Sequence, residues 1–228
     1  FNVGRLTPKR RGVLWCMHLI RWLVFVHEIR GEGPIDRETM VDIVLEGLGK
    51  PANQMMPPGF FGSSEKIPMP EYNPAKSKKL LADAGYSEGF EVDLYCTGDR
   101  LPGDAAICQG LGQMLTQVGI RTNVNAISKT VYFPAQARLD YSMFMNGWGT
   151  LTGEASYTLG GLAHSNNPEV KLGAYNRIEY ENSDVDRLLQ TGARMMDATA
   201  RRATYEEAME KVMEDKAYIS IVQLQTVW

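Results

Sequence analysis

Residues 90–96 read Phe-Glu-Val-Asp-Leu-Tyr-Cys, and residues 120–126 read Ile-Arg-Thr-Asn-Val-Asn-Ala. In both stretches apolar and polar side chains alternate, which is typical of a β-strand that turns one face to a core. Residues 104–118 lie between them, carry apolar side chains at helical spacing behind an aspartate, and are followed by a glycine. A strand, a helix and a strand in this order predict a βαβ unit with parallel strands.

The same alternation continues toward the carboxyl end. We expect a short helix near residues 130–139 and a third strand over 141–146. With short connections throughout, this order predicts an α/β fold on a mainly parallel sheet flanked by helices. The carboxy-terminal part is predicted to be helical. Its expected elements are helices over 154–163, from Ser183 and over 200–215, followed by a buried strand over 218–222.

The segment before this unit carries recognisable helix boundaries. Asp36 precedes apolar residues at helical spacing, so we expect it to cap a helix that ends at two nearby glycines. Five prolines between residues 50 and 72 predict an extended surface loop. Asn73 and Pro74 then predict the start of a second helix, which ends at Gly85.

Composition narrows the class of protein without naming a function. The 228 residues are 44% hydrophobic and 22% charged, which is ordinary for a globular protein, and the formal net charge is −3. No large basic excess is present, so nucleic acid and anionic membranes are not expected partners. The cysteines are Cys16, Cys96 and Cys108. A bridge between Cys96 and Cys108 stays open, but buried free thiols are the favoured interpretation.

Residues 1–33 are atypical. Three basic residues precede the apolar stretch Val13–Val26, as at the start of a signal peptide, but Arg21 interrupts that stretch. Its 14 residues are fewer than the roughly 20 that a membrane-spanning helix needs. We therefore interpret the segment neither as a working signal nor as an anchor, and a truncated or disturbed reading frame is the hypothesis that explains it.

No catalytic or metal-binding pattern stands out. The histidines His18, His27 and His164 lack metal-ligand spacing, and a surface or loop role is expected for His164. The turn Gly147–Gly153 follows a predicted strand and precedes a predicted helix, as in dinucleotide-binding proteins. Its glycine spacing is wrong and Trp148 separates the first two glycines, so a nucleotide-binding α/β enzyme domain is only the alternative. We predict no enzyme, no cofactor and no metal.

The same turn has a better match. The run Met143–Gly149 with Thr152–Ser156 resembles the Gly-Trp segment of the extracellular solute-binding proteins of family 5, which serve ABC transporters. Further segments agree with that family in the same order. They are Ile35–Glu38, Pro51-Ala52, Pro57–Gly59, Tyr72–Lys76, Leu80–Tyr86, Leu115–Ile120, Tyr175-Asn176 and Val185–Leu189.

The resemblance implies a fold and a set of partners. Residues 34–228 are expected to be the carboxy-terminal lobe of a type II periplasmic-binding-protein fold, whose full-length members close two lobes on a ligand. The partners implied are a peptide-like small solute, transporter permease subunits and the missing amino-terminal lobe, in a monomer. The implied location is periplasmic, for a precursor with a signal peptide. Without the first lobe we expect weak solute binding or none, and a non-functional single-lobe fragment remains the other alternative.

The resemblance also implies ligand-binding residues. Peptide-binding relatives place an aspartate three residues after the tryptophan, where this chain has Leu151, so Glu154 is the substitute for contacting a ligand amine; a solvated glutamate at a helix start is the other interpretation. Arg100 follows the first strand and is expected to bind a ligand carboxylate, with surface placement as its alternative. The remaining predicted contacts are Tyr132, Asn146, Gly147 and Trp148, of which Trp148 would form a wall of the cleft or pack in the core.

Overall fold

The computed structural model describes residues 2–4 and 32–225. They form two compact units. The first unit contains the described residues up to Ala52, Met69–Gly147 and Ile221–Gln225, and the second contains Asn53–Pro68 and Trp148–Ser220. Most of the atypical segment 1–33, with Cys16, His18 and His27, lies outside the described residues. The assignment of 34–228 to one lobe stays a prediction.

The first unit is built on a mainly parallel sheet, as predicted. The strands that the first unit contributes to this sheet are β5 (Phe90–Thr97), β6 (Ile120–Ile127), β7 (Met143–Asn146) and β1 (Asn2–Gly4), in the order β6-β5-β7-β1. Strand β5 pairs in parallel with β6 along its whole length and with β7 at one end, whereas β1 pairs with β7 in the antiparallel direction. The three carboxyl ends of β5, β6 and β7 therefore share one edge, where the connections to the helices begin.

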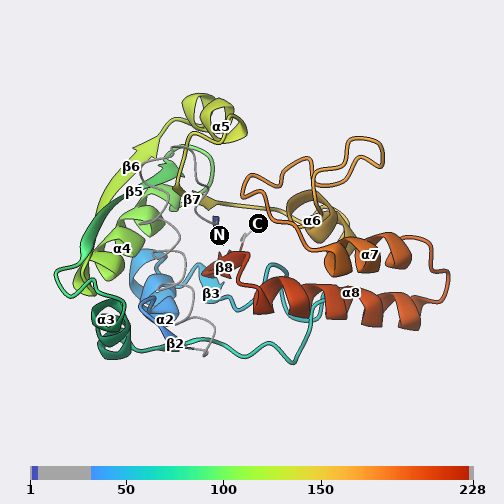
Figure 1. The fold of residues 1–228 in the computed structure, drawn as a ribbon, viewed down its shortest axis with the longest axis horizontal. Coiled ribbons are helices and arrows are strands. Elements are labelled where there is room, and N and C mark those ends of the chain that lie inside the picture. Colours follow the sequence, from blue (N-terminus) through green and yellow to red (C-terminus); the bar gives the residue numbers. More distant parts are fainter. Residues whose placement is uncertain (1, 5–31, 226–228) are drawn as a thin grey trace. The chain divides into compact units, whose positions relative to one another are not determined.

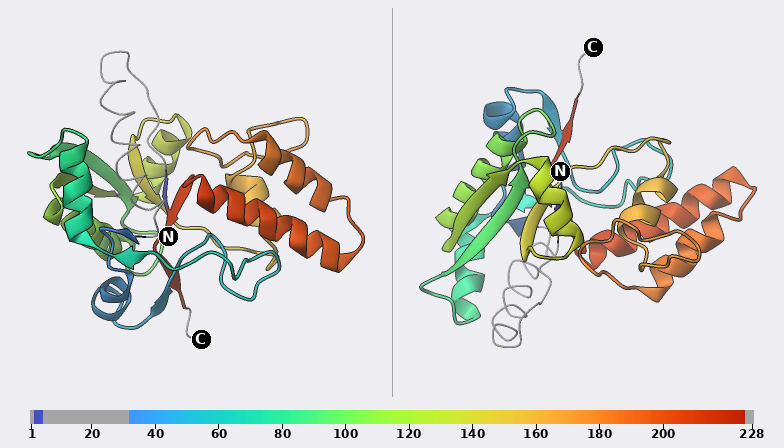
Figure 2. Two further views of the ribbon diagram at one scale, coloured as in Figure 1. Left: turned by 60° about the horizontal axis from the view of Figure 1, so that its bottom comes forward. Right: turned by 90° about the horizontal axis from the view of Figure 1, so that it is seen from above.

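Helices cover this sheet. Helix α4 (Asp104–Gln117) contacts β5 and β6, and α5 (Lys129–Ala137) follows β6, as Figure 1 and the turned views of Figure 2 show. Helix α3 (Pro74–Asp83) precedes β5 and begins where predicted, because Asn73 accepts a hydrogen bond from the amide of Lys76 at 3.0 Å. One core cluster lies at the amino ends of β5 and β6 and contains Leu81, Phe90, Leu115, Val118 and Ile120.

The beginning of the first unit contains short elements. Asp36 caps α2 (Arg37–Thr39) as predicted, by accepting the amide of Thr39 at 2.9 Å. The helix changes at once into the π-helical turn η1 (Met40–Val44) and ends earlier than its apolar pattern suggested, so Leu48 is 52% exposed. The proline-rich segment that follows lacks long elements, as predicted. The short strands around it are β2 (Glu32–Gly33), β3 (Gly49–Pro51) and β4 (Glu71–Tyr72).

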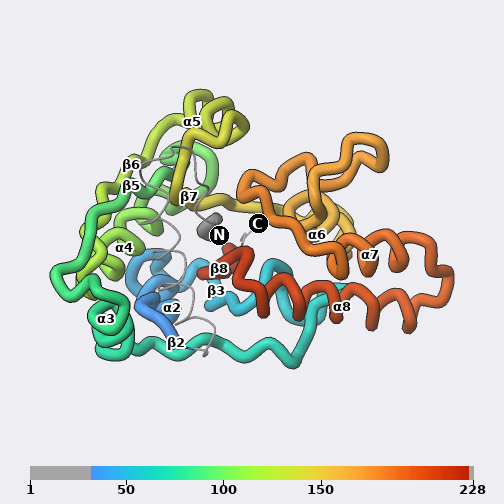
Figure 3. The backbone as a smooth tube through the Cα atoms, in the orientation of Figure 1, coloured from blue at the N-terminus to red at the C-terminus, as the bar shows by residue number. Residues whose placement is uncertain are grey.

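The second unit is helical, as predicted for this part of the chain. It contains α6 (Ala155–Leu162), α7 (Ser183–Gly192) and α8 (Ala198–Glu214), and α8 contacts both of the other helices. The tube in Figure 3 traces the long connection between α6 and α7 and shows α7 beside α8. The buried side chains that hold the three helices together include Leu159, Leu162, Val185, Leu188, Leu189, Tyr205, Met209 and Val212.

The closing strand differs from its prediction. Instead of one strand over 218–222, the chain forms β8 (Tyr218–Ser220) and then β9 (Val222–Leu224), which pairs with β3 in the antiparallel direction. Ile221 lies between them, is fully buried, and is the residue at which the chain passes from the second unit to the first. A continuous apolar run predicts burial correctly but does not show where the hydrogen-bonding partner changes.

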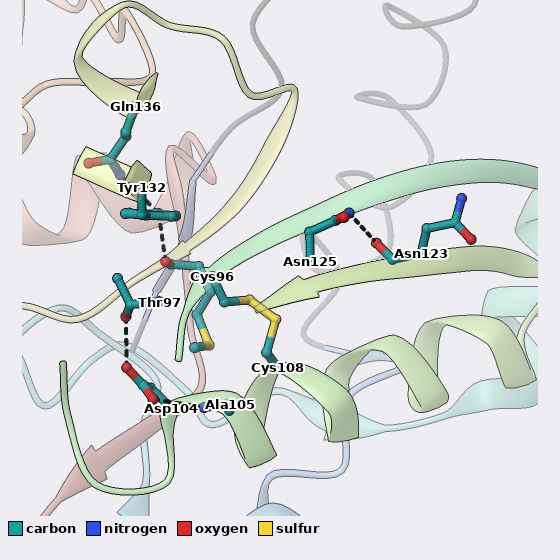
Figure 4. The surroundings of a disulfide bond; sticks show 10 residues. Cys96, Thr97, Asp104, Ala105, Cys108, Asn123, Asn125, Tyr132 and Gln136 are labelled. Carbon is teal, nitrogen blue, oxygen red and sulfur yellow. Dashed lines mark hydrogen bonds between the residues drawn. A yellow bond between two sulfur atoms is a disulfide. The ribbon is translucent and has the colours of Figure 1, made fainter. Parts of the chain in front are cut away.

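Cys96 and Cys108 form a disulfide, so the favoured interpretation of free thiols is wrong (Figure 4). Cys96 is near the end of β5 and Cys108 is in α4, with a Cα–Cα distance of 6.4 Å that suits a bridge. Both side chains are completely buried. The bridge ties the end of the strand to the helix that covers it.

Candidate functional site

Arg100 lies in the connection between β5 and α4 and reaches the end of β7. Its Nη1 donates a hydrogen bond to the carbonyl oxygen of Gly147 at 2.6 Å and lies 3.5 Å from Oδ1 of Asn146. The guanidinium also lies over the ring of Phe133 from α5, 5.1 Å from the ring centroid, in cation–π geometry. Three predicted residues, Arg100, Asn146 and Gly147, therefore come together at the carboxyl edge of the sheet.

The remaining donors of Arg100 are uncommitted. Neither Nε nor Nη2 has a hydrogen-bond partner within residues 2–4 and 32–225. The side chain is only half-buried, so a planar fork remains that could bind a carboxylate with two hydrogen bonds. Phe133 was not predicted to belong to this group. Its position next to Tyr132 was visible in the sequence, but nothing there indicated a cation contact.

Tyr132 lies in the core instead of at a surface that a solute could contact. It is fully buried, its hydroxyl donates to the carbonyl oxygen of Met145 at 2.8 Å, and that hydroxyl accepts from Nε2 of Gln136 at 3.2 Å. Burial raises the pKa of Tyr132 well above its usual value, so the hydroxyl keeps its proton and remains a donor. Tyr132 thus supports the end of β7 from behind, and its place in the core departs from the predicted ligand contact.

This hydroxyl gives the first prediction. In Tyr132→Phe the carbonyl of Met145 loses its buried donor, so the free energy of unfolding should fall by about 1–3 kcal/mol. Urea unfolding followed by circular dichroism measures the change. Tyr72→Phe is the control, because Tyr72 is 41% exposed and should change stability by less than about 0.5 kcal/mol. Equal effects of the two substitutions would show that the Tyr132 hydroxyl has no structural role.

Trp148 belongs to an aromatic cluster in the second unit. Its ring centroid is 5.5 Å from that of Tyr157 in α6 and 5.2 Å from that of Tyr175. Tyr175 is 54% exposed, and Arg177 lies over its ring at 5.9 Å. The indole Nε1 of Trp148 is buried and has no hydrogen-bond partner in the part of the chain that the structure describes. The cluster offers an aromatic surface with an unsatisfied donor beside it.

Glu154 is partly buried and lies beside a cation, so it is not a freely solvated glutamate. Its Oε1 lies 3.5 Å from Nε of Arg201, and its side chain is 26% exposed. The guanidinium of Arg201 also lies 5.1 Å from the ring centroid of Phe61. The backbone of Phe61 forms hydrogen bonds with Gly153 and Ala155, the two neighbours of Glu154. Leu151, which stands where peptide-binding relatives carry an aspartate, is 82% exposed. The second unit therefore contains no unpaired acid close behind Trp148 among Leu151–Glu154.

His164 is buried, which differs from the expected surface placement. Its side chain contacts the carbonyl oxygen of Ser165 through Nδ1 at 2.6 Å and Gln190 through Nε2 at 3.0 Å. It lies directly after α6, so the expected loop position is correct. Within the described residues no group of three or more metal-ligating side chains occurs, and no helix is both long and apolar enough for a bilayer.

Two other features, a hollow beside α4 and the glycine turn after β7, are poor candidates for a binding site. A hollow of about 420 Å³ lies beside α4 and β6, is lined mainly by glutamine and threonine side chains such as Gln113 and Thr122, and contains none of the predicted residues. The first two glycines after β7, Gly147 and Gly149, do not lie at the start of a helix, since α6 begins only at Ala155. A dinucleotide-binding turn requires the helix amino terminus at the turn itself, so the nucleotide alternative lacks its structural basis.

The comparison with protein families decides the class. Residues 34–169 match the model described as bacterial extracellular solute-binding proteins, family 5 Middle. The chain belongs to this family. Its members bind solutes for ABC transporters instead of converting them, which confirms the predictions of a binding protein and of a non-enzymatic function.

Relatives support this assignment over part of their length. The glutathione-binding protein GsiB of Salmonella choleraesuis is 29% identical over 194 residues, which are 82% of this chain and 37% of that protein. The dipeptide-binding protein of a Pseudoalteromonas species in complex with Met-Leu has a TM-score of 0.80 at 19% identity, over 98% of this chain and 42% of that one. The periplasmic binding protein DppA of Helicobacter pylori in complex with a peptide has a TM-score of 0.76 at 22% identity, over 99% and 43%.

The chain thus spans about two fifths of the length of the proteins it matches. At these identities the solved structures show a shared fold, which confirms the predicted periplasmic-binding-protein architecture. The solutes in their names are properties of those proteins.

Proposed function

We propose that this chain supplies ligand-contacting residues of a periplasmic solute-binding protein that delivers a small, carboxylate-bearing, peptide-like solute to an ABC importer. Arg100 carries the proposal, because it is a half-buried cation with two uncommitted donors next to backbone that is already fixed. Membership of the family supports the transport role. Glutathione and dipeptides, which occur in the names of relatives, both contain a carboxylate on a short peptide backbone.

The contact between Arg100 and Gly147 prepares the arginine for this task. With Nη1 held by a carbonyl oxygen and the guanidinium plane supported by Phe133, the remaining edge has a defined direction. A carboxylate meeting that edge forms charge-assisted hydrogen bonds without first ordering a long flexible side chain. Because Glu154 is paired with Arg201, we propose that the carboxylate of the solute, and not its amine, is the group that this chain recognises.

In the second unit, taken by itself, Trp148 is proposed as an apolar contact for a solute. Tyr157 and Tyr175 keep its ring in place, so the ring loses little freedom when it binds. Its indole N–H has no partner in the described part of the chain, and a solute carbonyl that reached it would make a hydrogen bond that the protein leaves unmade. In the first unit we propose Asn146 and Gly147 as the neighbours of Arg100 that shape its site, and Tyr132 as a support for the end of β7.

Arg100→Ala tests the proposal. The probe is the dipeptide Met-Leu, titrated into the 228-residue chain and into its variants. Binding is followed by the backbone amide NMR signals of Asn146 and Gly147, which all of these proteins retain, and in the wild type also by the Nε–Hε signal of Arg100. Loss of a charge-assisted hydrogen-bond pair should weaken binding about 10- to 100-fold. Arg100→Lys should recover only part of the loss, since an ammonium cannot form two parallel bonds.

The control ligand is Met-Leu amide, which lacks the carboxylate. It should bind the wild-type chain more weakly than Met-Leu does, and Arg100→Ala should leave its affinity unchanged. Equal binding of both ligands to the wild-type chain, or no shift of the Arg100 signal at the solubility limit of Met-Leu, would contradict the proposed role of Arg100.

A further inference from the structure

A buried carboxylate fixes the main chain around Arg100. Asp104 is the first residue of α4 and is only 2% exposed. Its Oδ2 accepts three hydrogen bonds, from Oγ1 of Thr97 at 2.7 Å and from the amides of Arg100 at 3.1 Å and Leu101 at 3.2 Å. No ion pair to Asp104 occurs among the described residues, so hydrogen bonds alone compensate its charge.

Asp99 anchors the same connection from the other side. Its carboxylate accepts a hydrogen bond from the amide of Lys129 at 2.7 Å and from the hydroxyl of Ser128 at 3.0 Å, both at the start of α5. The bond from the Lys129 amide lowers the pKa of Asp99, so the carboxylate is charged at neutral pH. Arg100 therefore follows a residue tied to α5 and is itself tied, through its own amide, to the first residue of α4.

The disulfide joins the two ends of the connection between β5 and α4. Cys96 immediately precedes Thr97, and Cys108 is one helical turn after Asp104, so the loop that the disulfide closes contains both partners of the hydrogen bond between Thr97 and Asp104. Figure 4 shows the disulfide and the bond between Thr97 and Asp104 close together at the end of β5. The Oδ1 atom of Asp104 accepts the amide of Ala105 at 2.8 Å, which fixes the carboxylate to the helix as well.

We infer that Asp104 is the positioning residue of Arg100 and that the Cys96–Cys108 disulfide holds Asp104 and Thr97 together for this purpose. The inference rests on the proposed role of Arg100 as a carboxylate contact. Asp104 does not touch the guanidinium. It fixes the backbone from which the side chain starts, so the guanidinium reaches both Phe133 and the carbonyl of Gly147.

Positioning matters because arginine has many rotamers. A guanidinium whose backbone moves must be ordered when a solute binds, and this ordering weakens affinity. With Asp104 in place, the backbone position of Arg100 is set before the solute arrives. Loss of Asp104 should therefore weaken the binding of a carboxylate while leaving the charge and chemistry of Arg100 intact.

Asp104→Asn tests the inference in the absence of any solute. The amides of Arg100 and Leu101 should exchange with deuterium about tenfold faster or more, and the Nε–Hε signal of Arg100 should shift or broaden. Thr97→Val is the second variant, for the case that Asp104→Asn does not fold, and should give a smaller change in the same signals. Reduction of the disulfide in the wild-type chain should act in the same direction.

Asp197→Asn is the matched control, because Asp197 caps α8 through the amide of Ala200 at 2.7 Å but lies in the second unit. It should leave the Arg100 signal and both amides unchanged. If Asp104→Asn and Thr97→Val also leave them unchanged, the inference is wrong.

The binding experiment separates this inference from the proposed function. Asp104→Asn should weaken the binding of Met-Leu about threefold to tenfold. It should leave the binding of Met-Leu amide almost unchanged. If the solute-free signals move but wild-type protein does not bind Met-Leu, Asp104 positions Arg100 and the proposed function is wrong. If the solute-free signals move and Met-Leu binds both proteins equally, the position of Arg100 does not affect affinity, and the inferred role of Asp104 in solute binding is overturned.

Discussion

Replacing Cys96 and Cys108 together by alanine is expected to lower the free energy of unfolding of the first unit by about 3 kcal/mol. The bridge joins residues 12 positions apart, so it removes loop-closure entropy from the unfolded chain. Both side chains are completely buried, and their truncation adds a small packing loss. A loss of this size is a large part of the stability of an ordinary domain.

Guanidinium chloride unfolding of wild-type and double-variant chains, each with and without a thiol reductant, measures this effect. The reductant should lower the free energy of unfolding of the wild-type chain and leave that of the double variant unchanged. Because both cysteines are buried in the folded chain, intact-mass measurement after alkylation of the protein unfolded in guanidinium chloride without reductant reports whether the two thiols are bonded. Modification of both thiols without reductant, or equal unfolding midpoints for wild type in both conditions, would show that the bridge does not form.

The sequence predicted the sheet well because each element has a local cause. Alternating side chains define β5 and β6, and Asn73 and Asp36 cap their helices through their own side chains. These interactions join residues that are close together in the sequence, so sequence patterns can predict them. The boundaries are less certain where propensity is weak, and β7 begins at Met143, two residues later than predicted.

Pairings across the chain could not be predicted in this way. Whether Cys96 meets Cys108 depends on how α4 returns over β5, and the choice between thiols and a bridge needs that geometry. The break at Ile221 depends on the pairing of β9 with β3, a strand more than 160 residues earlier in the chain. The hydrophobic pattern does not reveal this break, because the residues on both sides of Ile221 are buried.

The candidate site was predictable only where it follows from the order of the strands. Arg100 follows the end of β5 and Asn146 is the last residue of β7, the parallel strand beside it, so their meeting follows from parallel topology. The burial of Tyr132 and the pairing of Glu154 with Arg201 depend on side-chain directions and on distant helices. Asp104 was visible as a residue at a helix start, but its bonds to the Arg100 connection were not.

Gly89→Ala should be among the most damaging substitutions of one small residue by another in the first unit. Gly89 precedes β5 and has φ +69°, where a side chain is strained. A Cβ at this position would lie 1.9 Å from the carbonyl oxygen of Gly119, and that same oxygen accepts the amide of Phe90 at 3.2 Å. The clash therefore cannot be relieved without disturbing the first hydrogen bond at the start of β5 and β6.

The expected loss is about 2–5 kcal/mol, from about 1–2 kcal/mol for the left-handed backbone and about 1–3 kcal/mol for the close contact. Gly85→Ala separates the two contributions, because Gly85 has φ +87° but nothing lies within 4 Å of the Cβ that would be added. It should cost only the backbone contribution, about 1–2 kcal/mol. Thermal and urea unfolding of the two variants measure the difference directly. If Gly85→Ala is as costly as Gly89→Ala, the backbone conformation alone accounts for the loss; a larger cost for Gly89→Ala means that β5 and β6 approach too closely there for any side chain.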